Sequence, residues 1–127
     1  MKHFIPFLLL FAGIFSANAQ MVNVTFEVNM ANEETSPEGV FLAGGADFGT
    51  PGVNPMNDDD GDDVWTISVE VAAGYTGYYT FTNGACASWS CKENIVGQDC
   101  AAGTYNDREL VNITEDVTIS TCFGQCT

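Results

Sequence analysis

Strict alternation of apolar and polar residues is the main pattern of the chain beyond residue 20. From Val22 to Met30 every second residue is apolar and the residues between them are polar. Successive side chains of a β-strand point to opposite faces, so this period of two predicts a half-buried strand. The same alternation runs from Trp65 to Val71 and from Val117 to Thr121. We therefore expect β-strands in these three ranges.

Three other segments fit strands by composition. Residues 39–43 form a short apolar segment, and residues 75–82 are rich in tyrosine, threonine and phenylalanine. Residues 108–113 are the third segment that can form a strand. Turn formers such as Asp60-Gly61 and Gly74 separate the strands. Helical periodicity is absent beyond residue 20. Six or seven short strands between turns predict an all-β fold, an antiparallel β-sandwich of about six to eight strands.

The first 19 residues follow a different pattern. Lys2 precedes an apolar run over residues 4–15, and small residues follow up to Ala19. This order predicts a secretory signal peptide over residues 1–19. A retained membrane anchor is the alternative, although the run is shorter than the roughly 20 residues that span a bilayer. Cleavage would leave residues 20–127 as a single domain that is secreted, either extracellular or periplasmic.

Charge and histidine content exclude several functions of the mature chain. Cleavage removes His3, the only histidine, and leaves Lys92 and Arg108 against 17 acidic residues, a net charge of −15. Such a chain does not bind nucleic acid or anionic lipid by charge, and no membrane insertion is expected. Without histidine it has no Ser-His-Asp triad and no histidine-bound zinc. No pair of carboxylates is singled out for glycoside hydrolysis, so we expect a protein that is not an enzyme.

Five cysteines lie in the last third of the chain. They are Cys86, Cys91, Cys100, Cys122 and Cys126. In an exported protein they predict disulfides, and the odd number leaves one thiol over. Zinc is the competing explanation, but the spacings lack the paired Cys-x-x-Cys arrangement of a thiolate zinc site. The shortest closures, Cys86 to Cys91 and Cys122 to Cys126, are the expected pairs.

An acidic run occupies residues 57–63. Its alternate carboxylates, Asp58, Asp60 and Asp62, are ligands of the type that a calcium ion prefers. The helix-loop-helix calcium motif does not fit, because Asp63 stands where that motif needs glycine and Val69 where it needs glutamate. A solvated hairpin turn is the simpler explanation of the run, so calcium is kept as a possible ligand and no other cofactor is expected.

Trp89 is the candidate centre of a binding site. It lies between two serines on a connection bounded by Cys86 and Cys91, without the apolar neighbours of a core residue. Aromatic faces stack on the C–H faces of sugar rings, while amides and charges bind the hydroxyls. The alternative is that Trp89 packs onto the disulfides as a lid, whereas Trp65 is expected in the core. Polar candidates for the sugar hydroxyls are Asn83, Lys92, Glu93, Asn94, Asn106 and Arg108.

Several segments resemble a known family. They are Gly39-Val40-Phe41-Leu42-Ala43-Gly44, Asn54-Pro55-Met56, Asp63-Val64-Trp65-Thr66-Ile67, and Tyr78-Tyr79-Thr80-Phe81 followed by Asn83-Gly84 and a tryptophan. This order resembles the starch-binding-domain-like carbohydrate-binding modules related to family 20. The motifs Trp-Ser-Cys-Lys-Glu-Asn and Cys-Phe-Gly-x-Cys are similar to cysteine-bearing modules in secreted proteins of marine Bacteroidetes. The resemblance covers roughly residues 22–113. It implies an immunoglobulin-like sandwich and non-catalytic binding of α-glucan or another polysaccharide.

The resemblance also implies a site. In the family, a tryptophan after the Tyr-x-Phe strand binds with a nearby glutamate or lysine and an asparagine. The residues at comparable positions here are Trp89, Lys92, Glu93 and Asn94. Asn106 and Arg108 match a following Asn-Arg pair loosely, because an insertion with Cys100 intervenes. Phe48 stands where the family has a second tryptophan, so the resemblance leaves the glycan open.

The alternative function is that of an extracellular structural or adhesion protein, stabilised by calcium and contacting other proteins. Binding modules ordinarily travel with the catalytic domain that they target, and no such domain is present in this sequence. That observation favours the alternative. A polysaccharide-binding module of this kind would associate with a separate surface protein or enzyme.

Overall fold

Seven β-strands form the regular structure of residues 20–127, the part of the chain that the computed structural model describes. Within that part there is no helix long and apolar enough to cross a membrane. The predicted signal peptide, residues 1–19, lies outside the described residues. The strands are β1 (Met21–Asn29), β2 (Val40–Ala43), β3 (Asn54–Pro55), β4 (Val64–Ala72), β5 (Tyr75–Asn83), β6 (Arg108–Ile113) and β7 (Val117–Cys122).

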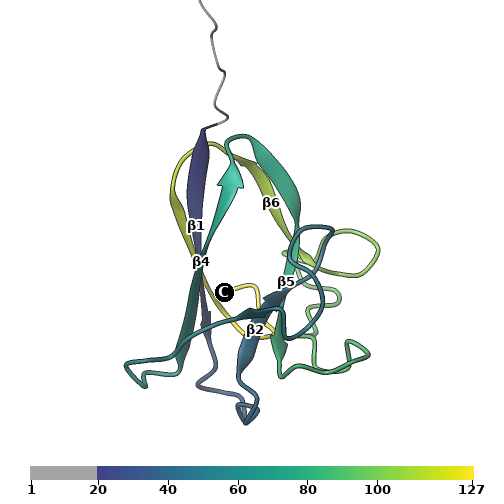
Figure 1. The fold of residues 1–127 in the computed structure, drawn as a ribbon. Helices are drawn as coiled ribbons and strands as arrows, with labels where there is room; N and C mark the ends of the chain where they lie inside the picture. Colours follow the sequence, from purple (N-terminus) through teal and green to yellow (C-terminus); the bar gives the residue numbers. More distant parts are fainter. Residues whose placement is uncertain (1–19) are drawn as a thin grey trace, which may run out of the picture.

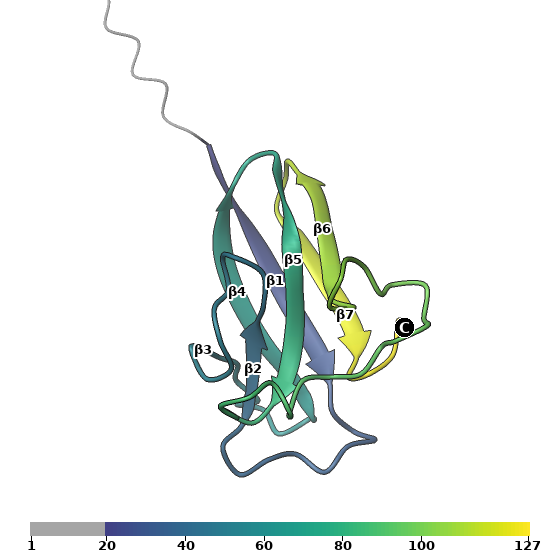
Figure 2. The same ribbon diagram turned by 90° about the vertical axis from the view of Figure 1, so that its right-hand side faces the viewer.

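The strands form two sheets that face each other. One sheet has the order β4-β1-β7 and the other the order β3-β2-β5-β6 (Figures 1 and 2). The all-β class and the number of strands are confirmed, and each range with period-two alternation is a strand. Pairing is antiparallel except between β1 and β7, which run parallel with Val24 opposite Val117. Parallel neighbours need a long crossover, and here the whole second sheet lies between β1 and β7 in the sequence.

The core lies between the two sheets and is built from the inward positions of each strand. In β1 the residues Val22, Val24, Phe26 and Val28 are buried while their neighbours in sequence face outward. The ring of Phe26 contacts aromatic rings of the opposite sheet, as its centroid lies 4.8 Å from Tyr79 and 6.3 Å from Phe81. Such tilted and edge-on pairs add to the stabilisation from burial.

Two aromatic residues singled out in the sequence belong to this core. Trp65 is half-buried and packs against it, in agreement with the expectation. Phe48 is also buried, and its ring lies edge-on to Phe26 at 5.9 Å. The residue that replaces the family's second tryptophan is therefore a core residue and offers no surface for stacking.

Residues 91–93, here called the added segment, extend the edge of the second sheet beyond β6. Strand β6 pairs with β5 only as far as Tyr79. Beyond that point residues 91–93 lie along β5, where Asn83 N–H donates to the carbonyl of Cys91 (2.9 Å) and Glu93 N–H to that of Phe81 (3.0 Å). Residues 84–90 are therefore the loop of a hairpin between β5 and this added segment, and Trp89 belongs to that loop.

Candidate functional site

The loop that carries Trp89 is closed covalently at its base. A disulfide joins Cys86 to Cys91, as the sequence predicted. The amide of Lys92 donates a hydrogen bond to the carbonyl of Trp89 (3.1 Å), and 39% of the tryptophan surface remains accessible. Trp89 is thus one of the large hydrophobic residues that the fold leaves partly in solvent.

Trp89 has an unusual backbone conformation. Its φ is 62°, in the left-handed region. The other non-glycine residues with positive φ in residues 20–127 are Asp63, Asn106 and Asn112, of the types that tolerate it best. For a bulky residue the left-handed conformation costs about 1–2 kcal/mol and persists only where the surrounding structure enforces it. The disulfide and the hydrogen bonds at the loop base supply that constraint, and residues strained in this way cluster at ligand sites.

Asn83 anchors the base of the loop. Its side-chain oxygen accepts a hydrogen bond from the amide of Ser36 (2.7 Å), and its Nδ2 donates to the carbonyl of Glu34 (3.0 Å). A Cβ added to the next residue, Gly84, would lie 3.1 Å from Ser36 Oγ. The start of the Trp89 loop is therefore tightly packed against the connection between β1 and β2. Both polar groups of the Asn83 amide are thereby used within the protein and position the Trp89 loop.

Lys92 connects the Trp89 loop to a second loop. Its ammonium lies 2.6 Å from a carboxylate oxygen of Asp107 and donates to the carbonyl of Tyr105 at 2.5 Å. Its backbone amide meanwhile binds the carbonyl of Trp89. The two side chains are only 17% and 12% exposed, so the pair is largely buried, and removing either partner would leave the other charge poorly solvated. The main effect of the pair is to hold the two loops in a fixed relation.

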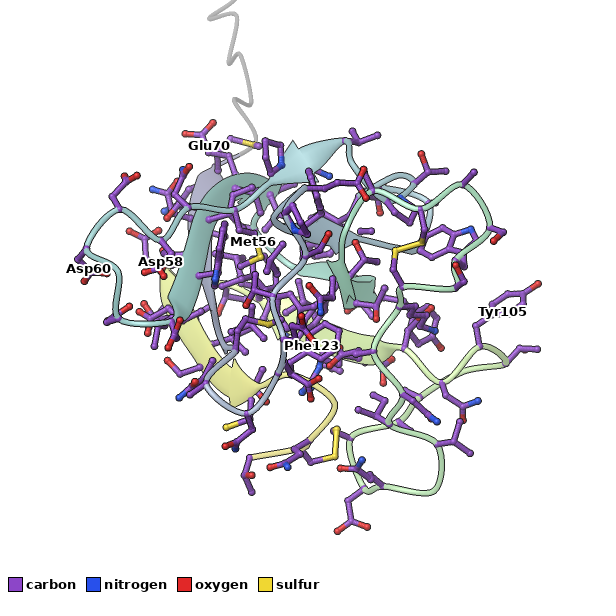
Figure 3. The ribbon with its side chains drawn as sticks, turned by 90° about the horizontal axis from the view of Figure 1, so that it is seen from below. Met56, Asp58, Asp60, Glu70, Tyr105 and Phe123 are labelled. Atoms are coloured by element: carbon purple, nitrogen blue, oxygen red, sulfur yellow. A yellow bond between two sulfur atoms is a disulfide. The ribbon has the colours of Figure 1, made fainter. Side chains whose placement is uncertain are left out.

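Two exposed tyrosines lie on or beside this second loop, and sequence reasoning missed both. Tyr105 is 78% exposed and projects from the edge of the molecule (Figure 3). Tyr78, on the outer face of β5, is 40% exposed, and the loop passes its ring at Gly103, where an added Cβ would lie 3.2 Å from Tyr78 Cζ. For Tyr105 the sequence held a signal, because it stands among polar residues without apolar periodicity, just as Trp89 does.

Glu93 and Arg108, two predicted hydrogen-bonding partners of the glycan, form a buried ion pair instead. They are 3% and 4% exposed, and the guanidinium binds the carboxylate in bidentate fashion, Nε to Oε1 at 2.7 Å and Nη2 to Oε2 at 2.8 Å. Burial alone would lower the pKa of Arg108, but the hydrogen bonds and charge of Glu93 outweigh it and raise that pKa. Both side chains are therefore too deeply buried to contact a ligand.

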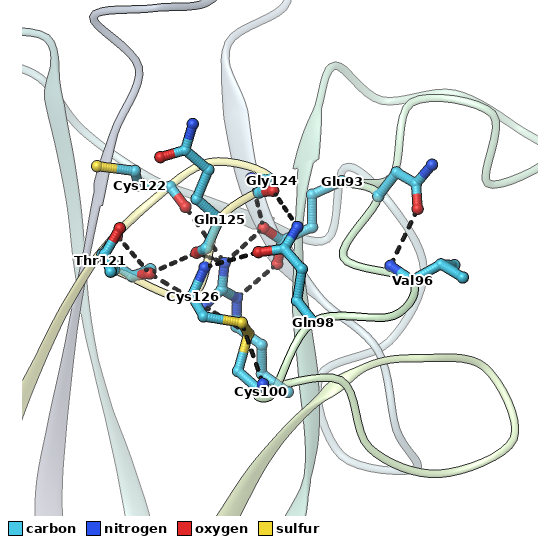
Figure 4. The surroundings of a disulfide bond; sticks show 12 residues. Glu93, Val96, Gln98, Cys100, Thr121, Cys122, Gly124, Gln125 and Cys126 are labelled. Atoms are coloured by element: carbon cyan, nitrogen blue, oxygen red, sulfur yellow. Dashed lines mark hydrogen bonds and ion pairs between the residues drawn. A yellow bond between two sulfur atoms is a disulfide. The ribbon is translucent and has the colours of Figure 1, made fainter.

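This ion pair is the centre of a larger network that joins three parts of the chain. Glu93 also accepts hydrogen bonds from the amides of Phe81 (3.3 Å) and Gly124 (2.9 Å). Arg108 also donates to Thr121 Oγ1 (3.0 Å) and to the carbonyls of Cys122 and Gln125. The added segment, β6 and residues 121–125 are thus fastened together (Figure 4). Every buried side-chain nitrogen and oxygen in residues 20–127 has a hydrogen-bond partner.

The second disulfide differs from the sequence prediction. Cys126 pairs with Cys100, and Cys122 carries the free thiol, so the expected Cys122–Cys126 pair is wrong (Figure 4). The reason is the alignment of the last residues with residues 98–100. Gln98 Nε2 donates to the carbonyl of Gly124 (2.8 Å), and Gln98 Oε1 accepts from the amide of Cys126 (3.1 Å). Cys126 therefore meets Cys100, while Cys122 is still part of β7.

The remaining predicted polar residues lie nearer to solvent. Asn94 is exposed, and its side-chain oxygen accepts a hydrogen bond from the amide of Val96 (3.1 Å). Asn106 is half-buried next to Tyr105. Half-buried Lys92 contacts the backbones of both Trp89 and Tyr105.

The acidic loop is brought together as the calcium hypothesis requires, on the side of the molecule opposite Tyr105 (Figure 3). Oxygen atoms of Asp58, Asp60 and Asp62 all lie within 4.8 Å of one another. A side-chain hydrogen bond to Asp62 is the main cause that raises the pKa of Asp60, and the amide of Val64 is the main cause that lowers the pKa of Asp62. Asp58 accepts from the amides of Asp62 and Asp63, both at 3.1 Å, as in a capped turn.

Comparison with known proteins gives one informative result. No protein-family model and no curated protein matches the sequence. Among solved structures, a glycoside hydrolase family 15 glucoamylase from Hypocrea jecorina matches with a TM-score of 0.55. The fold is shared with part of that glucoamylase. The match covers 81% of this chain and 17% of the glucoamylase at 15% identity, so the likeness concerns the fold and not the enzyme's activity.

Proposed function

We propose that the protein is a secreted, non-catalytic polysaccharide-binding module whose ligand stacks on Trp89. The observation that carries the proposal is the strained backbone of Trp89 in a loop closed by a disulfide, with 39% of the residue exposed. Residues held in such strained backbone conformations cluster at ligand sites. The shared fold with part of a glucoamylase supports a carbohydrate ligand.

The charges around the loop indicate the class of polysaccharide. Residues 20–127 hold 17 acidic residues against Lys92 and Arg108, and Arg108 is buried in its ion pair. This surface would repel an anionic glycan, whereas a neutral glycan meets no charge repulsion. The half-buried amide of Asn106 and the Lys92–Asp107 pair supply donors and acceptors for hydroxyl groups. We therefore infer a neutral polysaccharide.

Affinity electrophoresis tests this function. The mature protein is run in native gels that contain starch, laminarin or xylan, beside Trp89→Ala and Trp89→Gly. We expect at least one polysaccharide to retard the protein, and both variants to bind it at least about tenfold more weakly, which corresponds to about 1.4 kcal/mol. Val96→Ala, a change at another exposed apolar residue, is the matched control and should bind normally.

The glycine variant separates binding from stability. Glycine adopts positive φ without strain, so Trp89→Gly should unfold no more easily than Trp89→Ala. If both variants fold and both lose retardation, the indole itself binds the glycan. Retardation that is the same in the wild-type protein and in both variants would contradict a role for Trp89, and no retardation by any glycan would contradict the function.

The alternative function, a structural or adhesion protein stabilised by calcium, rests on the acidic loop. If Asp58, Asp60 and Asp62 hold calcium, millimolar calcium should raise the melting temperature, because a ligand that binds only the folded state stabilises it. The double variant Asp60→Asn, Asp62→Asn should then lose that increase. Magnesium at the same concentration controls for ionic strength. A melting temperature that calcium does not change would leave the loop as a solvated turn.

A further inference from the structure

We propose that Tyr105 is a second stacking surface of the same site, so that Trp89 and Tyr105 together bind a chain of at least two sugar rings. This inference rests on the proposed function and specifies the form of the ligand. It starts from the exposure of Tyr105, which at 78% is the highest among the exposed large hydrophobic residues of residues 20–127. A phenol ring has the same flat apolar face that suits tryptophan for sugar binding.

The loop of Tyr105 is held in one conformation although its tip is in solvent. Ala102 and Asp107 exchange two backbone hydrogen bonds, of 2.7 and 2.9 Å, and close the loop between them. Within it Gly103 and Asn106 have positive φ, 70° and 53°, which fixes two sharp turns of the backbone. A ring presented on a backbone ordered beforehand loses less conformational entropy on binding than one on a mobile loop.

Lys92 fixes the position of this loop relative to Trp89. Its amide binds the carbonyl of Trp89, and its ammonium binds both the carbonyl of Tyr105 and the carboxylate of Asp107. The backbones of the two aromatic residues are thus connected through a single lysine. The part of this ion pair that stays exposed, 17% of the Lys92 side chain and 12% of that of Asp107, offers a donor and an acceptor for sugar hydroxyls beside the two loops. Two exposed aromatic residues on loops that are held together in this way suit a chain of linked sugar rings.

The outer face of the second sheet extends the same surface. Tyr78 is 40% exposed beneath the loop, and exposed Glu109 lies directly opposite it on β6. The side chain of Tyr78 supports the loop at Gly103, where the two are close enough that a Cβ would lie at 3.2 to 3.5 Å from the ring. Exposed Tyr78 therefore lies next to the loop that carries Tyr105.

The length of the ligand is the measurable consequence. Two linked stacking events on one chain act at high effective concentration, so affinity should rise steeply once the ligand is long enough to reach both rings. Binding to Trp89 alone would give affinities that hardly depend on length beyond the first rings. We expect the wild-type affinity to increase at least tenfold from the disaccharide to the hexasaccharide.

Isothermal titration with oligosaccharides tests the inference. The mature protein, Tyr105→Ala, Tyr105→Phe and Val96→Ala are titrated with maltose, laminaribiose and xylobiose and with the corresponding hexasaccharides. Tyr105→Ala should bind the hexasaccharide about tenfold more weakly and lose the dependence on length. Tyr105→Phe keeps the aromatic face and should bind within threefold of the wild-type protein, as should Val96→Ala. Because Tyr105 is exposed, its variants should melt at the wild-type temperature.

The outcomes separate this inference from the function on which it rests. If Trp89→Ala weakens binding and Tyr105→Ala does not, the second stacking surface is overturned and the proposed function stands. A wild-type affinity that is equal for the disaccharide and the hexasaccharide overturns it too. If the wild-type protein binds neither polysaccharide nor oligosaccharide, both proposals fall.

Discussion

Replacing Glu93 by glutamine is expected to lower the free energy of unfolding by about 3–5 kcal/mol, as for other buried pairs that lose one charge. The variant keeps the shape of the side chain but leaves the Arg108 guanidinium as an uncompensated charge, 4% exposed. It also weakens the acceptor of the Phe81 and Gly124 amides. Denaturant unfolding of the mature protein, followed by circular dichroism, measures the effect.

Two further variants show whether the loss comes from the buried charge. Combining Glu93→Gln with Arg108→Met removes both charges, and the double variant should be destabilised by less than the sum of the single variants, since residues in one network couple. The Lys92–Asp107 pair, whose side chains are somewhat more exposed at 17% and 12%, is the comparison, and Lys92→Met should cost less than Glu93→Gln. Equal losses for Glu93→Gln and Lys92→Met would contradict the buried network.

Replacing both Cys100 and Cys126 by serine is expected to cost about 3.5 kcal/mol of stability. The bond spans 26 residues, and in the chain-entropy model the cost grows with the length of the closed segment. The Cys86–Cys91 bond spans five residues, so the corresponding double serine variant should lose about 2 kcal/mol. Glycan binding should follow the opposite order. The double serine variant at Cys86 and Cys91 should weaken it more than the one at Cys100 and Cys126, because it frees the backbone of Trp89.

Peptide mapping under non-reducing conditions checks the pairing that underlies this prediction. The expected fragments join Cys86 to Cys91 and Cys100 to Cys126, and Cys122 is alkylated as a thiol once the protein is denatured. A fragment that joins Cys122 to Cys126 would contradict the structure. So would a Cys100 and Cys126 double variant that is more stable than the Cys86 and Cys91 double variant.

The strands were predictable because their signal is local. Alternation in Val22 to Met30 follows from one face meeting the core, and that holds whichever strands are neighbours. The parallel pairing of β1 with β7 depends on how the chain returns after the second sheet, and no local pattern records it. The Cys122–Cys126 pair was wrong for a related reason. Its prediction used distance along the chain, whereas Gln98 aligns the last residues with a segment 26 residues away.

The candidate site was predictable only in part. Trp89 stands out because no core periodicity explains it, and the structure leaves it partly exposed. Glu93 and Arg108 are polar residues near it in sequence, and nothing local distinguishes a carboxylate that faces solvent from one that closes a buried network. Nothing local in the sequence showed that the Asn83 amide binds the protein backbone at the loop base and not a ligand. Tyr105 carries the same signal as Trp89, because it is a large aromatic residue among polar neighbours without apolar periodicity.

The most direct test of the central claim is a two-dimensional NMR titration of the mature protein, which contains two tryptophans, Trp65 and Trp89. Each gives one indole N–H signal, and the half-buried Trp65 serves as an internal control. The titrant is the hexasaccharide of whichever polysaccharide retards the protein. We expect the Trp89 signal to shift in a saturable way while the Trp65 signal stays in place. Saturable binding that leaves the Trp89 signal unmoved would contradict the account.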